Sequence, residues 1–431
     1  MLEPVSARLN ELTASEVARR VNSGDITAAE VVGECVSRIV AREPVVHAFA
    51  YMDPELAMRQ AQLIDRRTIR GPLHGVPIGI KDVIDTADQP TQMGSPIYQD
   101  HRPACDAACV ALLRAAGAVI LGKTITAEFA GMTAGPTTNP RNAAHTPGGS
   151  SSGSAAAVAD FMLPAALGTQ TGGSVLRPAS YCGVVGYKPT FGAFNRAGLK
   201  FAAESLDTIG LMARSIEDIA LITSVLLGGK LEAAAIAGAP RIGLCRTSIW
   251  NLAEAETKHA VEDAAARLAQ AGATVREVAL PAEFSGLKEA ARETINNYER
   301  SKSMAAEWGT HRDMISTKLA RCISLGLDMP HAEYLDALRL GESCRAALPS
   351  VFGDLDILLA PCVNGEAPLG LQSTGDPSFQ AIWTILHVPA MTLPTHTGPR
   401  GLPVGIQLIG RRYEDQRLFA CAKWVWERLK A

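Results

Sequence analysis

The chain has 431 residues, with 41 Lys and Arg against 44 Asp and Glu, and 47% of its residues are hydrophobic. A chain of this length buries enough surface for a stable core, and a net charge of −3 gives no electrostatic case for a nucleic-acid groove or an anionic membrane surface. A membrane span needs about 20 consecutive apolar residues, and Arg114, Asp160 and Gly228 interrupt the longest apolar stretches. We therefore expect a globular protein with neither a nucleic-acid nor a membrane partner.

The N-terminal residues and the cysteines together favour a cytoplasmic location. Met1-Leu-Glu-Pro4 is not followed by the basic and apolar regions of a secretory leader. The nine cysteines are scattered and odd in number, which is typical of reduced thiols. Cys105 and Cys109 have no matching Cys or His pair at ligand spacing, so we expect no metal site.

The first 70 residues predict helices. Thr13-Ala-Ser-Glu16 and Thr27-Ala-Ala-Glu30 are capping boxes, each of which opens a helix. After the second box, apolar residues recur at helical spacing, namely Val31, Val32, Cys35 and Ile39. We expect residues 1–70 to form a helical preface to the rest of the fold.

The remaining chain alternates strands with helices. A helix over about 107–116 precedes the apolar run Ala118-Val-Ile-Leu121, which is typical of a buried strand. After Gly228, residues 241–278 predict a strand, a helix and a strand, and a charged helical section follows over about 287–348. The closing elements are strands at 356–360, 390–393 and 405–409 and a helix from about 415. Because strands return late in the chain, we expect them to join one sheet.

Two short motifs match catalytic patterns without the context that those patterns need. Gly117–Thr124 fits the phosphate-binding loop G-x4-G-K-[ST], but its four intervening residues are themselves the apolar strand. Gly149–Gly153 fits the nucleophile elbow G-x-S-x-G with Ser151 at its centre, yet a loop precedes it where an elbow needs a strand. A Ser-His-Asp site would draw its base from late histidines such as His387 or His396. Both interpretations remain minor alternatives.

Three further segments together contain the groups that acyl transfer needs. In Gly75–Asp82, strand alternation places Lys81 on a face of small residues, so its amine points inward. Burial disfavours the ammonium form, and a neutral amine can act as a general base.

The second segment, Pro147–Ser154, is a glycine-serine loop that opens an alanine-rich helix. In the third, Gly168–Ser174, Gly172 and Gly173 let backbone N–H groups of residues 171–174 converge on one oxygen. Ser174 follows directly and can attack a carbonyl carbon held there. The three segments supply a base, a bridging hydroxyl and a nucleophile beside an oxyanion hole formed by Thr171, Gly172, Gly173 and Ser174.

These residues resemble the amidase signature family. The segment from Gly148 to Thr190, GGSSSGSAAAVADFMLPAALGTQTGGSVLRPASYCGVVGYKPT, is similar to the family's diagnostic stretch almost throughout, and the resemblance extends to Gly75–Asp82, Ser205–Ser215 and Gly401–Gln407. It implies a Ser–cis-Ser–Lys triad with Ser174 as nucleophile, Ser150 as the serine of a cis peptide and proton bridge, and Lys81 as base. Ser151 would support this network. No cofactor is implied.

The resemblance also implies the fold. We expect an α/β structure whose large central mixed β-sheet is covered by helices on both faces, with residues 1–431 as one domain and 230–350 as a more variable, substrate-shaping region. Two positions depart from the family pattern. Gln170 stands where an aspartate is usual, and Leu176 stands where an arginine is common, with Arg177 following it. These changes leave the charge interactions behind Ser174 open.

The family's substrates range from fatty-acid and aryl amides to carbamates, ureas and protein-bound glutamine, so the resemblance gives a small amide or carbamate-type substrate without naming it. We expect Met132 and Trp383 to bind substrate. Further apolar residues could line an apolar pocket, although core packing is the more common role of such residues; they are Tyr298, Met304, Trp308, Met314 and Ile382. A homodimer is one possible assembly. The alternative function is glutamine hydrolysis by a component similar to the transamidase A subunit, which delivers ammonia to a partner.

Overall fold

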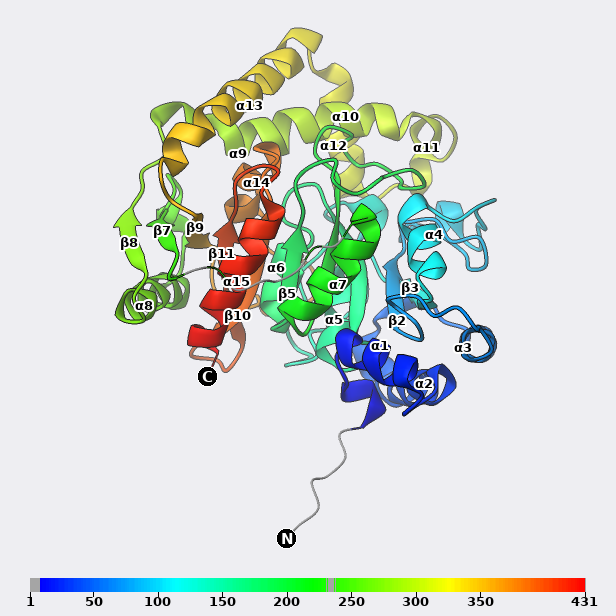
Figure 1. Ribbon diagram of the computed structural model, residues 1–431. Helices are drawn as coiled ribbons and strands as arrows, with labels where there is room; N and C mark the ends of the chain where they lie inside the picture. Colours follow the sequence, from blue (N-terminus) through cyan, green and yellow to red (C-terminus); the bar gives the residue numbers. More distant parts are fainter. Residues whose placement is uncertain (1–7, 230, 232–235, 237, 431) are drawn as a thin grey trace.

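The strands of the computed structural model pair edge to edge into one mixed sheet (Figure 1). The structure describes residues 8–229, 231, 236 and 238–430. Within these residues the sheet has eleven strands in the order β1-β3-β2-β4-β6-β5-β10-β11-β9-β7-β8. Strand β2 is parallel to β3 and β4, and β7 is parallel to β8 and β9, whereas the other pairs are antiparallel.

The central strands are buried on both faces, which explains their continuous apolar character. The strands are β1 (Phe49–Tyr51), β2 (Pro77–Lys81), β3 (Val119–Thr124), β4 (Ala165–Gln170), β5 (Val185–Lys188), β6 (Thr208–Ala213), β7 (Arg241–Leu244), β8 (Thr274–Glu277), β9 (Ile357–Pro361), β10 (Ala390–Thr397) and β11 (Pro403–Ile409).

The helices of the described chain differ widely in length. They are α1 (Ala14–Ser23), α2 (Ala28–Val46), α3 (Pro54–Asp65), α4 (Ala108–Ala115), α5 (Ser152–Ala159), α6 (Leu176–Cys182), α7 (Ile216–Leu227), α8 (Ala255–Gln270), α9 (Leu287–Glu289), α10 (Asn296–Ser303), α11 (Ala305–Thr310), α12 (Thr317–Asp328), α13 (His331–Phe352), α14 (Ser378–Ile385) and α15 (Asp415–Leu429). A π-helical turn, Ala290–Ile295, joins α9 to α10.

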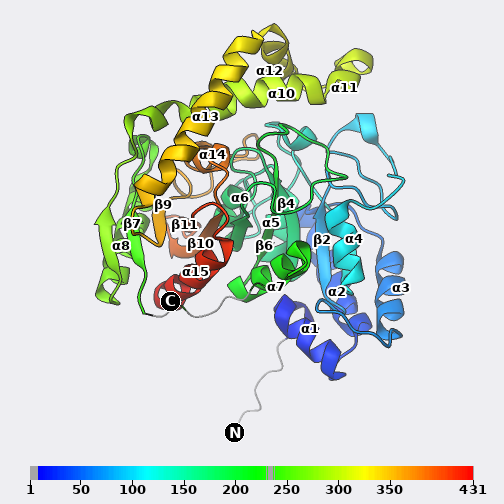
Figure 2. The same ribbon diagram turned by 45° about the horizontal axis from the view of Figure 1, so that its top comes forward.

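Helices cover the sheet on both faces, as expected for this α/β fold. Helices α7 and α15 lie in front of the sheet in Figure 1, where α7 contacts β6 and α15 contacts β10. Helices α5 and α6 lie behind it and contact β4 and β5 respectively. Helices α10, α12 and α13 form a separate layer across the top, which comes forward in Figure 2. This layer provides one wall of the cavity described below.

The predicted organisation is confirmed in most elements. The capping box at Thr27 forms completely, and Thr13 accepts the N–H of Glu16. The strands expected at 241–278 and in the last third of the chain all join the single sheet. The prediction that residues 1–70 are purely helical is wrong in one element, because Phe49–Tyr51 forms the edge strand β1, which pairs with β3. Three residues are too few for strand alternation to reveal them in the sequence.

The phosphate-loop motif does not form a phosphate site. Gly122, Lys123 and Thr124 lie inside β3, and the Lys123 side chain is fully buried. Its amine donates to the carbonyl oxygen of Ile84 at 2.9 Å and lies 3.5 Å from the Asp82 carboxylate. Lys123 therefore ties β3 to the segment after β2 and is occupied within the protein.

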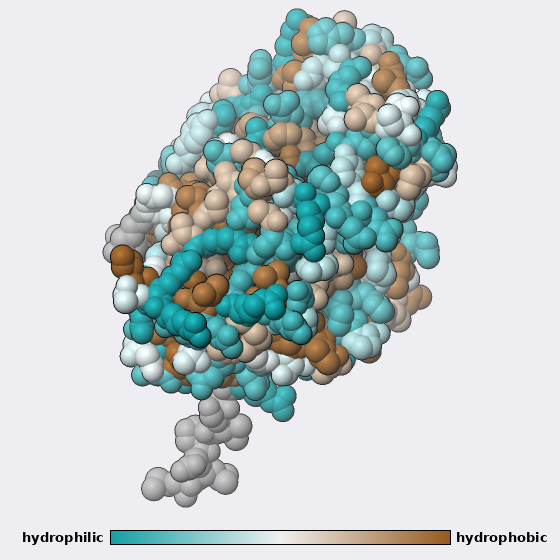
Figure 3. Space-filling view, turned by 90° about the vertical axis from the view of Figure 1, so that its right-hand side faces the viewer, coloured by the Kyte–Doolittle hydropathy of each residue, from teal (hydrophilic) through white to brown (hydrophobic). Residues whose placement is uncertain are grey.

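The surface is mixed in character. On the face shown in Figure 3, hydrophilic side chains predominate and hydrophobic ones are interspersed among them. Single exposed apolar residues of this kind are normal for folded proteins. In the described part of the chain, no helix combines the length and the apolar character needed to cross a bilayer.

Gly153, in α5, lies in close contact with the backbone at the end of β3 and before β1. A Cβ atom at this position would collide with the carbonyl oxygen of Ala48 and the amide nitrogen of Ile125. Neither backbone atom can move without disturbing the end of β3. We expect Gly153→Ala to lower the free energy of unfolding by about 3 kcal/mol or more, the upper range for overpacking, as measured by urea unfolding.

Gly33 provides the matched control, because it also lies within a helix but has open space around its missing Cβ. There Gly33→Ala should raise the free energy of unfolding by about 0.5–1 kcal/mol, since alanine restricts the unfolded chain and favours the helix. Equal effects of the two substitutions would show that helix propensity, and not the close contact, sets the outcome at Gly153.

Candidate active site

Lys81 ends β2 with its side chain completely buried. Its Nζ atom lies 2.7 Å from Ser150 Oγ and 2.7 Å from Thr169 Oγ1, and 3.4 Å from the Thr169 carbonyl oxygen. Thr169 lies on β4, the parallel neighbour of β2. Leu167 of β4 is in register with Ile80 of β2, which brings the end of β4 beside Lys81. The inward-pointing amine is confirmed, whereas Thr169 was not identified from the sequence. Only knowledge that β2 and β4 are neighbours could have placed it there.

Burial lowers the pKa of Lys81 from its usual value to about 7. Asp207 opposes this effect, while the cations Arg300 and Arg177 reinforce it. A neutral amine has two N–H donors and one lone pair. It can therefore accept the Ser150 hydroxyl proton while donating to the two oxygen atoms of Thr169, so that each short contact is satisfied.

The glycine-serine loop connects this amine to the start of α5. The Gly149–Ser150 peptide bond is cis, as the resemblance implies. Ser151 precedes the helix but does not cap it, because its hydroxyl donates to the Thr169 carbonyl oxygen and accepts the Thr169 N–H, both at 3.2 Å. The Ser151 N–H also donates to the Ser174 carbonyl oxygen at 3.3 Å. Ser151 thus fixes the strand that carries Thr169 relative to Ser150 and Ser174.

Ser174 lies in the loop between β4 and α6 and is 8% exposed. The backbone N–H groups of Gly172, Gly173 and Ser174 donate to no acceptor within the described residues. Thr171 donates its side-chain hydroxyl to Asp207, which also accepts the N–H groups of Ala202 and Ala203. The loop is therefore anchored from one side while its N–H groups stay free for a ligand oxygen.

Gln170 performs a structural task where the family usually has aspartate. Its Oε1 atom accepts the N–H groups of Val175 at 2.9 Å and Leu176 at 3.1 Å. Its Nε2 donates to Thr384 Oγ1 at 3.0 Å, and Thr384 Oγ1 donates to the Gly172 carbonyl oxygen at 2.7 Å. The amide thus holds both sides of the Ser174 loop without adding a charge behind it.

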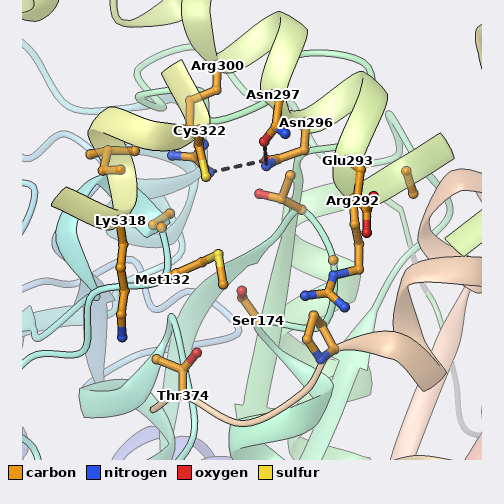
Figure 4. A pocket seen from close by; sticks show the side chains of 18 of the residues that line it. Met132, Ser174, Arg292, Glu293, Asn296, Asn297, Arg300, Lys318, Cys322 and Thr374 are labelled. Atoms are coloured by element: carbon orange, nitrogen blue, oxygen red, sulfur yellow. Dashed lines mark hydrogen bonds between the residues drawn. The ribbon is translucent and has the colours of Figure 1, made fainter. Parts of the chain in front are cut away.

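A cavity of about 210 Å³ opens beside Ser174. Figure 4 shows Ser174 and Thr374 below, Met132 at one side, and Arg292, Asn296 and Arg300 reaching down from the helical layer. The full lining is Ala130, Gly131, Met132, Thr171, Gly172, Gly173, Ser174, Arg177, Ala291, Arg292, Glu293, Asn296, Asn297, Arg300, Lys318, Leu319, Cys322, Thr374, Gly375 and Pro377. Its most prominent side chains are cations and amides.

The lining agrees only in part with the residues considered from the sequence. Met132 does line the cavity, but Trp383 does not: its side chain is fully buried in α14. The other apolar candidates of the sequence are also absent from the lining, namely Tyr298, Met304, Trp308, Met314 and Ile382. Met304 and Ile382 are buried in the core instead, and Met314 is 38% exposed outside this cavity.

The structure gives no support to a Ser-His-Asp site. Ser151 is fully buried and bonded to Thr169, His387 Nε2 lies 2.8 Å from the Ser205 carbonyl oxygen, and His396 pairs with Asp263. Burial lowers the pKa of His387 to about 3. In the described part of the chain, no three His, Cys, Asp or Glu side chains are grouped to hold a metal ion.

The comparisons with known proteins identify the family of the chain. The sequence model of the family described as Amidase matches residues 30–419. The chain is 35% identical to the A subunit of glutamyl-tRNA(Gln) amidotransferase from Roseiflexus sp. (strain RS-1) over 469 aligned positions, which cover 95% of each protein. It is similar to a chain from a structure described as a vestigial protein complex that reveals the origins of an s-triazine catabolic enzyme (TM-score 0.89, 29% identity, 97% of this chain and 100% of that chain).

A third similarity, to the peptide amidase of Stenotrophomonas maltophilia, has a TM-score of 0.82 and 29% identity over 97% of both chains. The segment matched by the family model contains β2, the glycine-serine loop and the Ser174 loop, and hence every residue around the buried amine. On the length of these matches and the identity of the relatives, the chain belongs to the amidase signature family.

Proposed function

We propose that the protein hydrolyses a C–N bond of a small linear amide or carbamate-type substrate through an acyl-enzyme on Ser174. The observation that carries this proposal is the fully buried Lys81 amine, which lies 2.7 Å from Ser150 Oγ. The next residue, Ser151, donates its N–H to the carbonyl oxygen of Ser174, which lines the cavity. A buried lysine costs folding free energy. Lys81 differs from the buried Lys188 in that its amine contacts two side-chain hydroxyl groups, those of Ser150 and Thr169, instead of carbonyl oxygens alone, which suits proton transfer.

In the proposed reaction, neutral Lys81 takes the hydroxyl proton of Ser150, and Ser150 takes that of Ser174 as Ser174 Oγ attacks the amide carbon. The free N–H groups of Gly172, Gly173 and Ser174 stabilise the negative oxygen that forms, with Thr171 anchoring this loop. Ser150 returns a proton to the leaving nitrogen, the C–N bond breaks, and water then cleaves the ester at Ser174. Ser151 supports the geometry through Thr169.

One step depends on substrate binding. Within the described residues, the hydroxyl groups of Ser150 and Ser174 do not hydrogen-bond directly, although the Ser151 N–H joins their two segments. Catalytic hydrogen bonds are often long without substrate and tighten in the complex. A carbonyl oxygen held by the Gly172–Ser174 N–H groups would orient the Ser174 hydroxyl toward Ser150.

A second candidate function is glutamine hydrolysis within an amidotransferase. It is supported by the 35% identity with the Roseiflexus protein over 95% of both chains. The discriminating experiment compares the purified chain on anilides, aliphatic amides, carbamates, ureas and glutamine. Turnover by the chain alone, without stimulation by glutamine or a partner, supports the stand-alone hydrolase.

Replacement of the proposed nucleophile or base should abolish turnover. Ser174→Ala and Lys81→Met should each lower kcat by about 10⁴-fold or more, because nucleophile and base act as one unit. A serine-directed fluorophosphonate should label Ser174, and peptide mapping by mass spectrometry locates the adduct. Labelling of Ser151 would contradict the proposed nucleophile and favour the elbow alternative.

Lys188 supplies the control for the loss of a buried lysine. It is fully buried on β5, burial lowers its pKa to about 7, and its amine donates to the carbonyl oxygens of Pro189 and Val388. Lys188→Met should keep the wild-type kcat in whatever fraction of the protein folds. If Lys188→Met lost as much activity per folded molecule as Lys81→Met, the base assignment would fail.

The pH dependence follows from the protonation state of Lys81. Below its pKa of about 7 the amine is an ammonium ion and cannot accept a proton, so kcat/KM should rise with pH through about 7 and then level. Steady-state kinetics across this range measure the midpoint in the free enzyme. A profile that stays flat through pH 7 would exclude Lys81 as the base, and Lys188→Met should leave the midpoint where it is.

A further inference from the structure

Arg177 is a buried cation beside the nucleophile whose N–H groups are only partly used. It lies three residues after Ser174 at the start of α6, lines the cavity, and is 3% exposed. Its Nη2 donates to the Gly149 carbonyl oxygen at 2.6 Å and to Thr374 Oγ1 at 3.2 Å. Its Nε and Nη1 have no partner within the described residues. Buried donors are normally paired, and a buried charge almost always is.

The segment that packs on Arg177 keeps this cation close to the cavity. Gly375 has φ +82°, and a Cβ atom there would lie 3.2 Å from Arg177 Cδ and closer still to the Tyr181 ring. Thr374, which accepts from Arg177, and Gly375 both line the cavity. The loop therefore holds the guanidinium in place, and its carboxylate, Asp376, hydrogen-bonds to Arg292 and not to Arg177.

Arg292 adds a second guanidinium to the same side of the cavity. It projects from the π-helical turn Ala290–Ile295 toward Ser174 (Figure 4). Asp376 accepts from Arg292 Nη1 at 3.3 Å, and the Arg292 side chain is 29% exposed. One carboxylate, Asp376, thus lies near two guanidinium groups, and the two arginines repel each other, as the pKa of Arg177, lowered to about 10 chiefly by burial and further by Arg292, indicates.

Arg300 is a second buried guanidinium that lines the cavity, and both of its terminal nitrogens are hydrogen-bonded. It is equally buried, but its Nη1 donates to the Phe129 carbonyl oxygen at 2.9 Å and its Nη2 to Asn296 Oδ1 at 3.3 Å. Figure 4 shows the contact with Asn296 as a dashed line. Within the described residues, Arg177 is the arginine that has buried nitrogens without a hydrogen-bond partner.

The charge of the lining is strongly one-sided. The cations are Arg177, Arg292, Arg300 and Lys318, and the single acidic side chain among the lining residues is Glu293, which is exposed. A ligand with a carboxylate would find partners here, whereas a ligand ammonium group would face like charges. The volume of about 210 Å³ limits the ligand to a small molecule.

We propose that Arg177, assisted by Arg292, binds a carboxylate of the substrate, so that the enzyme acts on short linear amides that carry a free carboxylate near the scissile carbonyl and no adjacent ammonium group. This inference rests on the proposed function and specifies its substrate class. We expect only a short spacer between the carboxylate and the scissile carbonyl of the substrate. Arg177 follows Ser174 by one helical turn, and its backbone N–H donates to the Gly173 carbonyl oxygen at 2.9 Å.

The kinetic test compares the monoamide of succinic acid with the methyl ester of the same compound, which removes the negative charge. The acid amide should have a kcat/KM about 100-fold or more above that of the ester, as a charge-assisted hydrogen bond in a buried site implies. Arg177→Lys should reduce this ratio by about tenfold or more, because lysine offers fewer donors in another geometry. Arg292→Gln should reduce it by a smaller factor.

The ratio separates binding from structural effects. Arg177 also holds Gly149, so a purely structural role would lower turnover of the acid amide and of the ester by the same factor and leave the ratio unchanged, which would overturn the proposal. Lys302→Gln removes a cation that lies outside this cavity, over the Tyr298 ring; it should change the ratio by less than about threefold. An equal effect of Lys302→Gln, or faster turnover of glutamine than of the acid amide, would also overturn it.

A binding measurement makes the test independent of catalysis. Isothermal titration of the Ser174→Ala protein with succinate should show binding that Arg177→Lys, added to the same protein, weakens by about tenfold or more. Equal affinity of the two proteins, or no binding to either, would contradict the carboxylate site. Failure of both the acid amide and the ester to turn over would instead count against the proposed function, while equal turnover of both would contradict the carboxylate site alone.

Discussion

The placement of one amine in the interior of the sheet is the constraint on which the site depends. Lys81 can be buried because β2 runs between two parallel strands and because Ser150 and Thr169 provide oxygen partners at 2.7 Å. Each partner requires its own support. Ser150 needs the cis peptide loop before α5, and Thr169 needs the two hydrogen bonds of Ser151. The same burial that costs folding free energy lowers the pKa of the amine to about 7 and makes it a usable base.

Much of this arrangement could be predicted from the sequence, because its signals are local. Apolar runs identify the central strands, the alternation in Gly75–Asp82 shows which way Lys81 points, and the glycine pair before Ser174 indicates exposed backbone N–H groups. The family resemblance then selects Ser150 among adjacent serines. The inferences about the strands, Lys81 and the glycine pair need only neighbouring residues, whereas the choice of Ser150 rests on the resemblance over Gly148–Thr190.

The cavity could not be predicted in the same way, because it is assembled across the chain. Its walls come from the segments near 130, 171–177, 291–300, 318–322 and 374–377. The apolar character of Trp383 led to the prediction that it binds substrate. A large apolar side chain in α14 is more stable in the core than beside water, and Trp383 is buried there. In the sequence, Arg177 stands out only because it lies one position after the place of the family's usual arginine, which Leu176 occupies. The structure shows that its bonds to Gly149 and Thr374 both come from Nη2, which leaves Nε and Nη1 without a partner.

Arg177 and Gln170 together connect recognition with chemistry. Gln170 holds the Ser174 loop with an amide, so no fixed carboxylate behind the nucleophile competes for the nearby cation. Arg177 contacts the residue before Ser150 and also lowers the pKa of Lys81 through its charge. A substrate carboxylate bound at Arg177 would offset that charge and raise the pKa of Lys81 in the complex. A higher pKa makes the amine a stronger base but leaves a smaller fraction of it neutral at a given pH, so these two consequences of substrate binding oppose each other.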